Sequence, residues 1–520
     1  MAAKLSLSGG AFTCVARLLT SLPSVGGAEA VVWAQDTASV IPPDHRFDVA
    51  RKKLQEAVAS GAVPGMAIAV AVNGKIVWEE GFGWANREER TRAGPHTMFG
   101  IGSISKSMTA TALMLLVRDG LVNLDRPAND YLGVGKIRGF AGDPSKATLR
   151  LVLSHKAGLP RHHQEFYADE GYSRPSMDET ILRYGILVNP PGERFVYANL
   201  DYGIVDYIIE RLSGRPYEEF METDLFTPLG LTRTYLLVPP KVRPGTAVLY
   251  DDAVRRIPYF DFDQRGGGAI FSSVHDLLRF GMFHLKDRLP DQRQILPDSL
   301  LDAMYRIGQP VPGLAAGEDY ALGWRVDTDA FGYRVIQHSG GMSGGAANLR
   351  LIPSRNIAVA AVANLHFNLT YNIADDILAA LLPDYARGLQ DGTTRTATRN
   401  EPRRPAFEAP AELLGEWVGQ VVTWERSVPI TVVFKPGGDV HVKLDDQLET
   451  TLNRVSYTDG SLGGRFAGRL TAPDIARRPH ILEFENVRLR DGKLVGALMA
   501  IDQTQRSHYA LPSWVELRRP

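Results

Sequence analysis

The sequence predicts a mixed α/β (α+β) fold, in which helices flank a mainly antiparallel sheet and a separate all-β domain follows. Residues 41–387 carry strand-like apolar runs near both ends, whereas 106–283 in between have mostly helical and loop patterns. The strands at the two ends must therefore meet in one sheet, with a helical subdomain inserted between them. Residues 388–410 are polar, rich in Arg, Thr and Pro, and lack periodicity, which indicates a linker. Short strand-like runs in 411–520, separated by glycine-containing turns, predict a C-terminal barrel or sandwich.

The predicted sheet domain begins with a helix and a hairpin. Apolar residues recur at helical spacing from Phe47 until Gly61 ends the pattern. Residues 63–85 then alternate small and bulky apolar side chains around Asn73-Gly74, a dipeptide that favours a type I′ turn with positive φ. Near the other end of the domain the pattern predicts two strands and a helix, at 347–352, 357–363 and 371–382.

Length, charge and cysteine content exclude several classes of protein. At 520 residues the chain is long enough for two or three domains with a sizeable core. The net charge of -1 provides no field that would steer the protein onto nucleic acid or an anionic membrane, so we expect neither as a partner. Because Cys14 is the only cysteine, internal disulfides, cysteine-ligated zinc and iron–sulfur clusters are excluded.

Residues 1–40 differ in composition from the rest and form a possible leader or disordered segment. Ala11–Leu19 resembles the apolar region of an export signal and Ala28-Glu29-Ala30 a cleavage site, although Arg17 interrupts the apolar run. If the leader functions, the protein is periplasmic or secreted, and otherwise cytoplasmic. No segment is long and apolar enough to predict an integral membrane helix.

The first candidate for chemistry is a serine one helical turn before a lysine. Ser103 and Lys106 open a strongly apolar helical stretch that Gly120 ends, and Lys106 is the only lysine with a serine three residues before it. This spacing places both side chains on one face, so the amine can lie beside the hydroxyl that it activates. The alternative is a capping serine followed by a solvated lysine.

Two further motifs, Tyr-x-Asn and His-x-Gly, follow in the chain, each on the kind of element that acyl-transfer chemistry requires. Tyr197-Ala198-Asn199 is the only Tyr-x-Asn sequence, and a phenol near a cation loses its proton more easily, whereas an amide can hold a substrate carbonyl or the lysine. His338 begins a glycine-rich run just before the second pair of strands, with Gly340 and Gly341 in it. A backbone N–H from such an edge, paired with that of the nucleophile, would form an oxyanion hole. A half-buried tyrosine and an incidental histidine are the alternative interpretations.

Taken together, these motifs resemble the serine β-lactamase and penicillin-binding-protein superfamily, within it the class C-like branch of esterases, D-amino-acid peptidases and D-Ala-D-Ala carboxypeptidases. The resemblance covers residues 47–382. It extends to other stretches of the branch, namely Phe99-Gly100-Ile101-Gly102, residues 153–160, Pro191-Gly192-Glu193, Gly266-Gly267-Gly268-Ala269 and Ser272-Ser273. We expect the block at 153–160, which contains His155, to be structural.

The resemblance implies a role for each motif residue. Ser103 would be the acylated nucleophile, Lys106 its activating neighbour, and Tyr197 the general base that later protonates the leaving group. Asn199 would contact the substrate amide or Lys106. The backbone N–H groups of Ser103 and Gly341 would form the oxyanion hole.

One position departs from the β-lactamase pattern. His338 stands where β-lactamases carry a lysine, and a largely neutral histidine recognises a substrate carboxylate less well. We therefore expect a serine hydrolase that acts through an acyl-enzyme on small-molecule esters or D-amino-acid amides and peptides, with no metal and no cofactor. A β-lactamase or penicillin-binding D-Ala-D-Ala carboxypeptidase is one alternative, and a catalytically silent penicillin- or peptide-binding protein is another.

The C-terminal domain carries a weaker resemblance. Leu414-Gly415-Glu416-Trp417, leading into strands, is similar to the lipocalin-like barrel appended to some members of the branch. Such a domain would serve as a lid or specificity element over the cleft, or as a stabilising or oligomerising appendage. Three neighbouring histidines, His155, His162 and His163, lack a carboxylate at ligand spacing, so we expect no metal site there.

Overall fold

The computed structural model describes residues 44–520, apart from 237–242, 252–254, 315–316, 330, 391–406 and 505–507. The predicted leader at 1–40 lies outside the described residues, as does most of the predicted linker at 388–410. The first three residues of the predicted linker, 388–390, belong to helix α10 (Pro383–Gln390).

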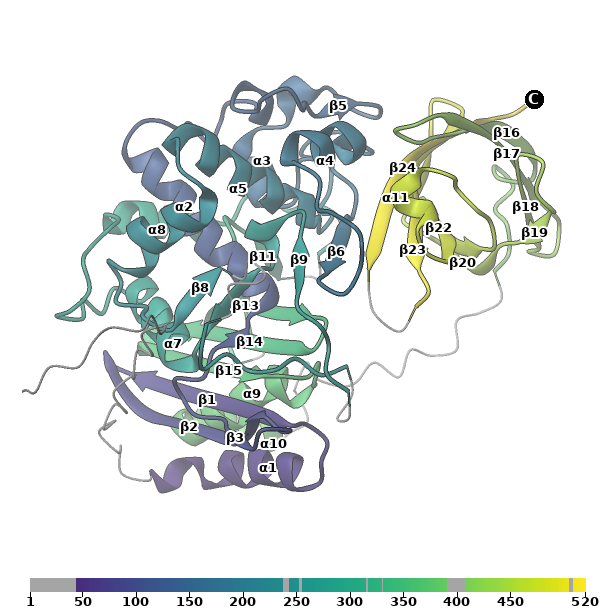
Figure 1. The fold of residues 1–520 in the computed structure, drawn as a ribbon. Helices are drawn as coiled ribbons and strands as arrows, with labels where there is room; N and C mark the ends of the chain where they lie inside the picture. Colours follow the sequence, from purple (N-terminus) through teal and green to yellow (C-terminus); the bar gives the residue numbers. More distant parts are fainter. Residues whose placement is uncertain are drawn as a thin grey trace, which may run out of the picture. The chain divides into compact units, whose positions relative to one another are not determined.

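An antiparallel sheet of eight strands forms the centre of the first domain (Figure 1). Strands from the two ends of the domain meet in it, as the sequence predicts, because β1 pairs with both β2 and β15. In order across the sheet the strands are β11 (Glu318–Tyr320), β12 (Arg325–Thr328), β13 (Arg334–Met342), β14 (Gly345–Ile352), β15 (Ile357–Ala363), β1 (Gly65–Val72), β2 (Lys75–Asn86) and β3 (Thr91–Arg92).

Helices cover both faces of this sheet, and the alternation of residues in β1 explains why (Figure 1). The alanines at alternate positions of β1, Ala67 among them, face the core that includes α7 (Val274–His284) and α2 (Ser105–Arg118). The larger residues between them, such as Ile68, face the core formed with α1 (Asp48–Ala59) and α9 (Leu369–Leu381). Because successive strand residues point to opposite faces, one fully apolar strand serves both layers.

The predicted hairpin and its flanking helix are confirmed. Asn73 and Gly74 have φ values of 51° and 72°, which is the positive-φ pair that a type I′ turn needs. The helix predicted from Phe47 to Gly61 is α1, and the helix predicted at 371–382 is α9, each shifted by only one or two residues.

The insertion between the sheet strands consists of helices joined by long loops. It contains short pieces of sheet as well, since β4 (Phe99–Gly100), β10 (Ile270–Ser272) and β8 (Thr234–Leu236) pair in that order, and β5 (Arg138–Gly139) pairs with β7 (Ile186–Leu187). The helices that build this subdomain are α3 (Leu149–Leu153), α4 (Met177–Tyr184), α5 (Asn199–Ser213), α6 (Tyr217–Phe220) and α8 (Asp298–Met304).

The C-terminal region is a nearly closed, barrel-like antiparallel sheet (Figure 1). Its strands in order are β19 (Thr450–Thr451), β18 (Val440–Leu444), β17 (Ser427–Phe434), β16 (Gly415–Val422), β24 (Tyr509–Arg518), β23 (Lys493–Asp502), β22 (His480–Arg490), β21 (Ser461–Phe466) and β20 (Asn453–Thr458), with a short helix α11 (Pro473–Ala476). Buried residues alternate along β17, as expected of strands that surround a core.

Two contacts join the barrel to the first domain. Strand β24 pairs with β6 (His163–Tyr167), which in turn pairs with β9 (Phe260–Phe262). In addition, Ile186 and Val188 pack with barrel side chains that include Trp514. The contact is therefore partly apolar.

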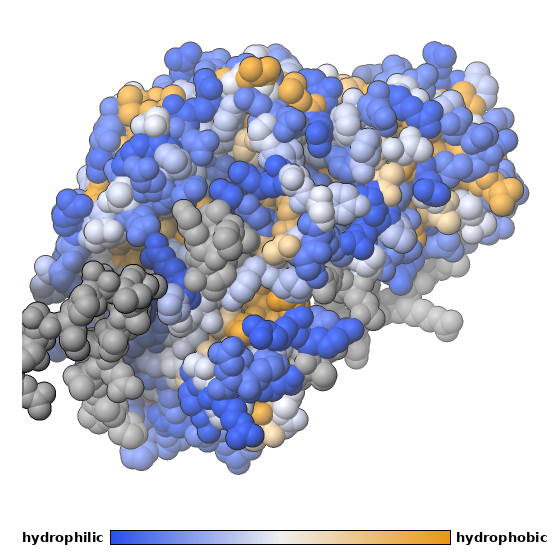
Figure 2. All heavy atoms as spheres, viewed as in Figure 1, coloured by the Kyte–Doolittle hydropathy of each residue, from blue (hydrophilic) through white to orange (hydrophobic). Residues whose placement is uncertain are grey.

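On the face that Figure 2 shows, the surface of the described chain is mainly polar. Hydrophilic residues predominate there, and hydrophobic ones form small separate groups (Figure 2). Among the described residues, no helix is both long enough and apolar enough to cross a membrane.

Candidate active site

Ser103 and Lys106 are brought together at the start of α2. Ser103 lies in the 3-10 turn Gly102–Ile104, immediately before the helix, and Nζ of Lys106 is 3.0 Å from its Oγ. The amine also lies 2.8 Å from Oδ1 of Asn199 and 2.7 Å from the carbonyl oxygen of Gly267. Lys106 is fully buried, so it is not the solvated cation of the alternative interpretation.

Burial changes the acid–base behaviour of Lys106. Desolvation lowers the pKa of its amine to about 7, against a smaller opposing effect of Asp201. A lysine with such a pKa is neutral in about half of the molecules at neutral pH. Lys106 can therefore accept the proton of the Ser103 hydroxyl, which an ordinary lysine does rarely.

Tyr197 also lies beside the amine of Lys106, just before α5. Nζ of Lys106 is 4.8 Å from the centroid of its ring, and the Ser103 side chain is close enough to lower the pKa of the phenol. A nearby cation, Arg325, does lower the pKa of Tyr197, but burial has the larger effect and raises that pKa. At neutral pH the side chain is a phenol, which can pass a proton on but is a poor first acceptor.

The segment that carries Tyr197 is held by a residue that sequence reasoning did not assign to the site. His155 accepts a hydrogen bond from the N–H of Val196 at its carbonyl oxygen (2.9 Å) and one from the N–H of Ala198 at Nδ1 (3.3 Å). Its ring also lies against that of Tyr197, with centroids 4.4 Å apart. The block at 153–160 is thus structural, as expected, and what it holds in place is Tyr197.

His155 is in turn fixed by a buried carboxyl group. Nδ1 of His155 lies 2.6 Å from Oδ2 of Asp201, and neither side chain is more than 1% exposed. Burial raises the pKa of Asp201 and lowers that of His155. The two residues are 46 positions apart. The pair can be recognised only in the folded structure, where the ring of His155 lies among tyrosine side chains.

The glycine-rich run at 338–345 is strand rather than a loop before strands, because β13 includes its first five residues. A Cβ atom at Gly340 would lie 1.8 Å from the carbonyl oxygen of Ile101 and 3.2 Å from the backbone nitrogen of Ser103. A Cβ atom at Gly102, where φ is 48°, would lie 2.9 Å from the nitrogen of Gly341. The glycines let the two backbones approach closely, so the backbone nitrogen of Ser103 lies near β13 and that of Gly341 lies near the turn that carries Ser103.

The side chain of His338, a residue of this strand, is buried, and both of its ring nitrogens have partners. Its Nε2 lies 2.7 Å from the hydroxyl of Tyr320, and its Nδ1 lies 2.7 Å from the carbonyl oxygen of Ser339. Because a carbonyl only accepts, Nδ1 carries the proton and Nε2 accepts from the tyrosine. Burial lowers the pKa of His338 to about 3, so the ring offers no positive charge. Whether it contributes to substrate binding stays a prediction.

Two side chains beside Gly341 were not singled out from the sequence. A Cβ atom at this glycine would be 3.3 Å from the hydroxyl of Tyr371 and 3.4 Å from the ring of His366. Tyr371 donates to the carbonyl oxygen of Gly340 (3.1 Å), and His366 is exposed.

Strand β6 links the barrel to the turn after β13. The carboxylate of Glu165 accepts from Oγ of Ser343 (2.9 Å) and from the hydroxyl of Tyr167 (2.6 Å), while its N–H donates to the carbonyl oxygen of His508 (2.7 Å). The other two histidines noted in the sequence each pair with a separate carboxylate, His162 with Asp263 and His163 with Glu165.

Comparison with known proteins identifies the family of the chain. A family profile described as Beta-lactamase matches residues 50–403, which is more than half of the chain. The chain belongs to the β-lactamase family. The superfamily resemblance and the fold class predicted from the sequence are thereby confirmed.

Individual relatives of this β-lactamase-family protein include a named hydrolase. The chain is 29% identical over 326 residues to the Unguisins hydrolase ungD' of Aspergillus campestris, with 59% of this chain and 60% of that protein aligned. The chain thus matches about three fifths of this relative's length.

Two solved structures are similar in fold. The octameric penicillin-binding protein homologue from Pyrococcus abyssi has a TM-score of 0.54 at 24% identity, covering 89% of this chain and 100% of that one. A class C β-lactamase has a TM-score of 0.55 at 19% identity, covering 65% of this chain and 96% of that one. At these identities the likeness concerns the fold alone.

Proposed function

We propose that this β-lactamase-family protein is a serine hydrolase that acts through an acyl-enzyme on esters or on D-amino-acid amides and peptides. The observation that carries the proposal is the buried amine of Lys106, 3.0 Å from Oγ of Ser103, with its pKa lowered to about 7. A hydroxyl becomes a useful nucleophile at neutral pH only when a base in contact with it can take its proton. The relationship to a protein named as a hydrolase supports the same conclusion.

In the first step, the neutral amine of Lys106 takes the proton of Ser103 while Oγ attacks the carbonyl carbon of the substrate. The carbonyl oxygen becomes negative and is stabilised by the backbone N–H groups of Ser103 and Gly341. Asn199 and the carbonyl of Gly267 accept from the ammonium ion that forms, so its charge is not left uncompensated in the interior.

In the second step, the bond between the carbonyl carbon and the leaving group breaks. Tyr197 lies against both the amine and Ser103, so its phenol gives its proton to the leaving oxygen or nitrogen and takes another from Lys106. This relay leaves an ester on Ser103 and a neutral lysine. Water then attacks the ester, with the same groups moving the proton in reverse.

The environment of His338 favours esters and uncharged amides over β-lactams. The ring is neutral and committed to Tyr320 and the backbone, so it does not supply the positive charge that a lysine would offer to a substrate carboxylate. A β-lactamase or D-Ala-D-Ala carboxypeptidase activity would require recognition of that carboxylate by another group.

A catalytically silent binding protein is the alternative of another class. It has no need for a desolvated amine in contact with a serine hydroxyl, because burying such a group is costly without a function.

The test of the proposed function is hydrolysis of short-chain p-nitrophenyl esters by the purified protein and by Ser103→Ala. We expect turnover that the substitution lowers by about three orders of magnitude or more, with an unchanged melting temperature. Equal activity of both proteins would refute the proposal.

A further inference from the structure

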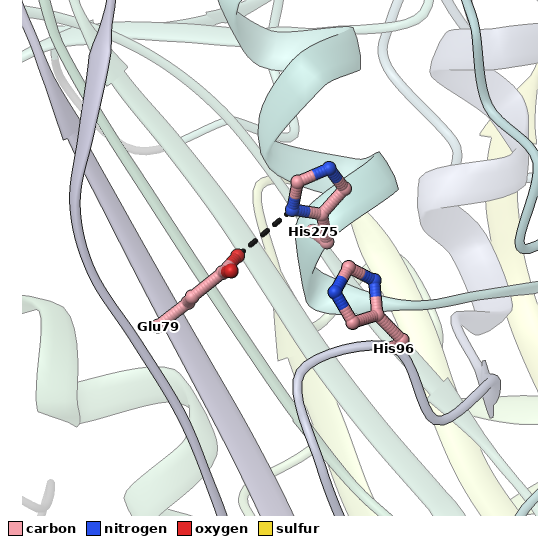
Figure 3. Close-up of side chains that lie close together, drawn as sticks. All are labelled: Glu79, His96 and His275. Carbon is pink, nitrogen blue, oxygen red and sulfur yellow. Dashed lines mark hydrogen bonds and ion pairs between the residues drawn. The ribbon is translucent and has the colours of Figure 1, made fainter. Parts of the chain in front are cut away.

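A second cluster of ionisable side chains lies outside the Ser103 site. Glu79, His96 and His275 come from three separate segments of the chain and point toward one another (Figure 3). One carboxylate oxygen and one ring nitrogen of each histidine all lie within 4.8 Å of one another. Nδ1 of His275 is 2.8 Å from Oε2 of Glu79, and the two imidazole centroids are 4.6 Å apart.

The fold places Glu79 and His275 opposite each other. In β2 the side chain of Trp78 packs in the core with α1, so that of Glu79, the next residue, points to the other face, which α7 covers. His275 is the second residue of α7, whose first turn begins at the capping residue Ser273.

His96 is brought to the same place by a turn. The N–H of Gly94 donates to Oγ1 of Thr97 (2.9 Å), and the N–H of Thr97 donates to the carbonyl of Gly94 (3.1 Å), with Pro95 between them. This turn lies against β2 at Gly81, where a Cβ atom would be 2.5 Å from Cα of Gly94. The N–H of His275 donates to the carbonyl oxygen of Pro95 (3.3 Å), which joins the turn to α7.

The donor set is the kind that holds a transition-metal cation. Two imidazole nitrogens and one carboxylate oxygen suit Zn²⁺ and similar borderline divalent ions, and three protein ligands leave a fourth position for water. Ligand atoms on a tetrahedral Zn²⁺ are roughly 3.4 Å apart, given bond lengths of about 2.1 Å, so small side-chain rotations suffice. The side chains of His275 and Glu79 are 26% and 12% exposed, so an ion and its water can reach them.

We propose that Glu79, His96 and His275 bind a divalent cation of the Zn²⁺ type, with water as the fourth ligand. The ion takes the place of the hydrogen between Nδ1 of His275 and Oε2 of Glu79, and the neutral imidazole then carries its hydrogen on Nε2. Because imidazole binds a metal only through an unprotonated nitrogen, affinity falls at acidic pH.

The ion has a structural consequence for the nucleophile segment. The turn that carries His96 runs into β4, and β10 runs into α7, while β4 and β10 pair with each other. A metal at this position therefore ties β2 and α7 to the chain that leads to Ser103. It is not a ligand to the substrate, and the proposed hydrolysis does not depend on it.

Metal binding to the full-length chain, prepared without a histidine affinity tag, tests the site. We expect one Zn²⁺ per chain by calorimetry, an intense tetrahedral absorption band with Co²⁺, and a higher melting temperature with either ion. His96→Ala, His275→Ala and the milder Glu79→Gln should each weaken binding by about tenfold or more and remove the thermal shift.

The matched control is His441→Ala. His441 also pairs with a glutamate, with Nδ1 2.7 Å from Oε1 of Glu449, but belongs to no such cluster of three in the described chain. This variant should bind Zn²⁺ like the unmodified protein. No saturable 1:1 binding by the unmodified protein, or binding that survives both Glu79→Gln and His275→Ala, would overturn the proposal.

Discussion

The pH dependence of serine acylation should report the lowered pKa of Lys106. With a pKa of about 7, the neutral fraction of the amine rises from about one tenth at pH 6 to about nine tenths at pH 8. Acylation of Ser103 should therefore increase about tenfold over this interval and then level off. An amine with the ordinary lysine pKa of 10.5 would be neutral about a thousandfold less often at pH 7, and its rate would keep rising beyond pH 9.

The assay is the second-order rate of labelling by a fluorophosphonate between pH 5.5 and 9.5, which isolates acylation-like chemistry from product release. Two variants show whether the titrating group in this assay is Lys106. Lys106→Arg places a permanently protonated group at the base position, so labelling should fall by about three orders of magnitude at every pH. Asn199→Asp puts a carboxylate at the position of an oxygen that is 2.8 Å from Nζ, which stabilises the ammonium form and should move the midpoint to higher pH.

Two outcomes would refute the reasoning on Lys106. A rate that does not change between pH 6 and 8 would show that its amine is not the proton acceptor. A midpoint that stays in place in Asn199→Asp would show that the titrating group is another residue.

Three further predictions concern the glycine strand, the histidine and the barrel. Gly340→Ala should abolish ester hydrolysis, because its Cβ atom would lie 1.8 Å from the carbonyl oxygen of Ile101. Gly341→Ala should retain much more activity, because its Cβ atom would lie 3.3 Å from its nearest neighbour. Equal losses of activity in the two variants would contradict the close approach of the two backbones. His338→Lys should raise kcat/KM for nitrocefin relative to a p-nitrophenyl ester, and efficient nitrocefin hydrolysis by the unmodified protein would contradict the proposed selectivity. A chain ending after Asn400 should fold but melt at a lower temperature, because it exposes apolar surface that the barrel covers, and insolubility would show that the barrel completes the core.

The parts of the fold that sequence predicts well depend on local rules. The turn at Asn73-Gly74 follows from the conformations that these two residues tolerate, and the helix after Pro43 follows from its apolar spacing. The contact of Ser103 with Lys106 follows from one helical turn of separation. Such features need no knowledge of the rest of the chain.

What sequence does not predict arises from contacts between distant segments. The pair of His155 and Asp201 spans 46 positions and has no motif of its own. The raised pKa of Tyr197 could not be predicted from the sequence, because the burial that causes it is a property of the assembled site. The role expected of His338 comes from the resemblance alone, which could not reveal that Tyr320 and the backbone occupy both ring nitrogens.

The central claim is that substrate becomes covalently attached to Ser103, and intact-protein mass spectrometry followed by peptide mapping tests it most directly. After brief exposure to a p-nitrophenyl ester or a fluorophosphonate, we expect a single adduct of the acyl or phosphonyl mass on the peptide that contains Ser103, and none in Ser103→Ala. An adduct on a different residue, or ester turnover by Ser103→Ala at the rate of the unmodified protein, would contradict the claim.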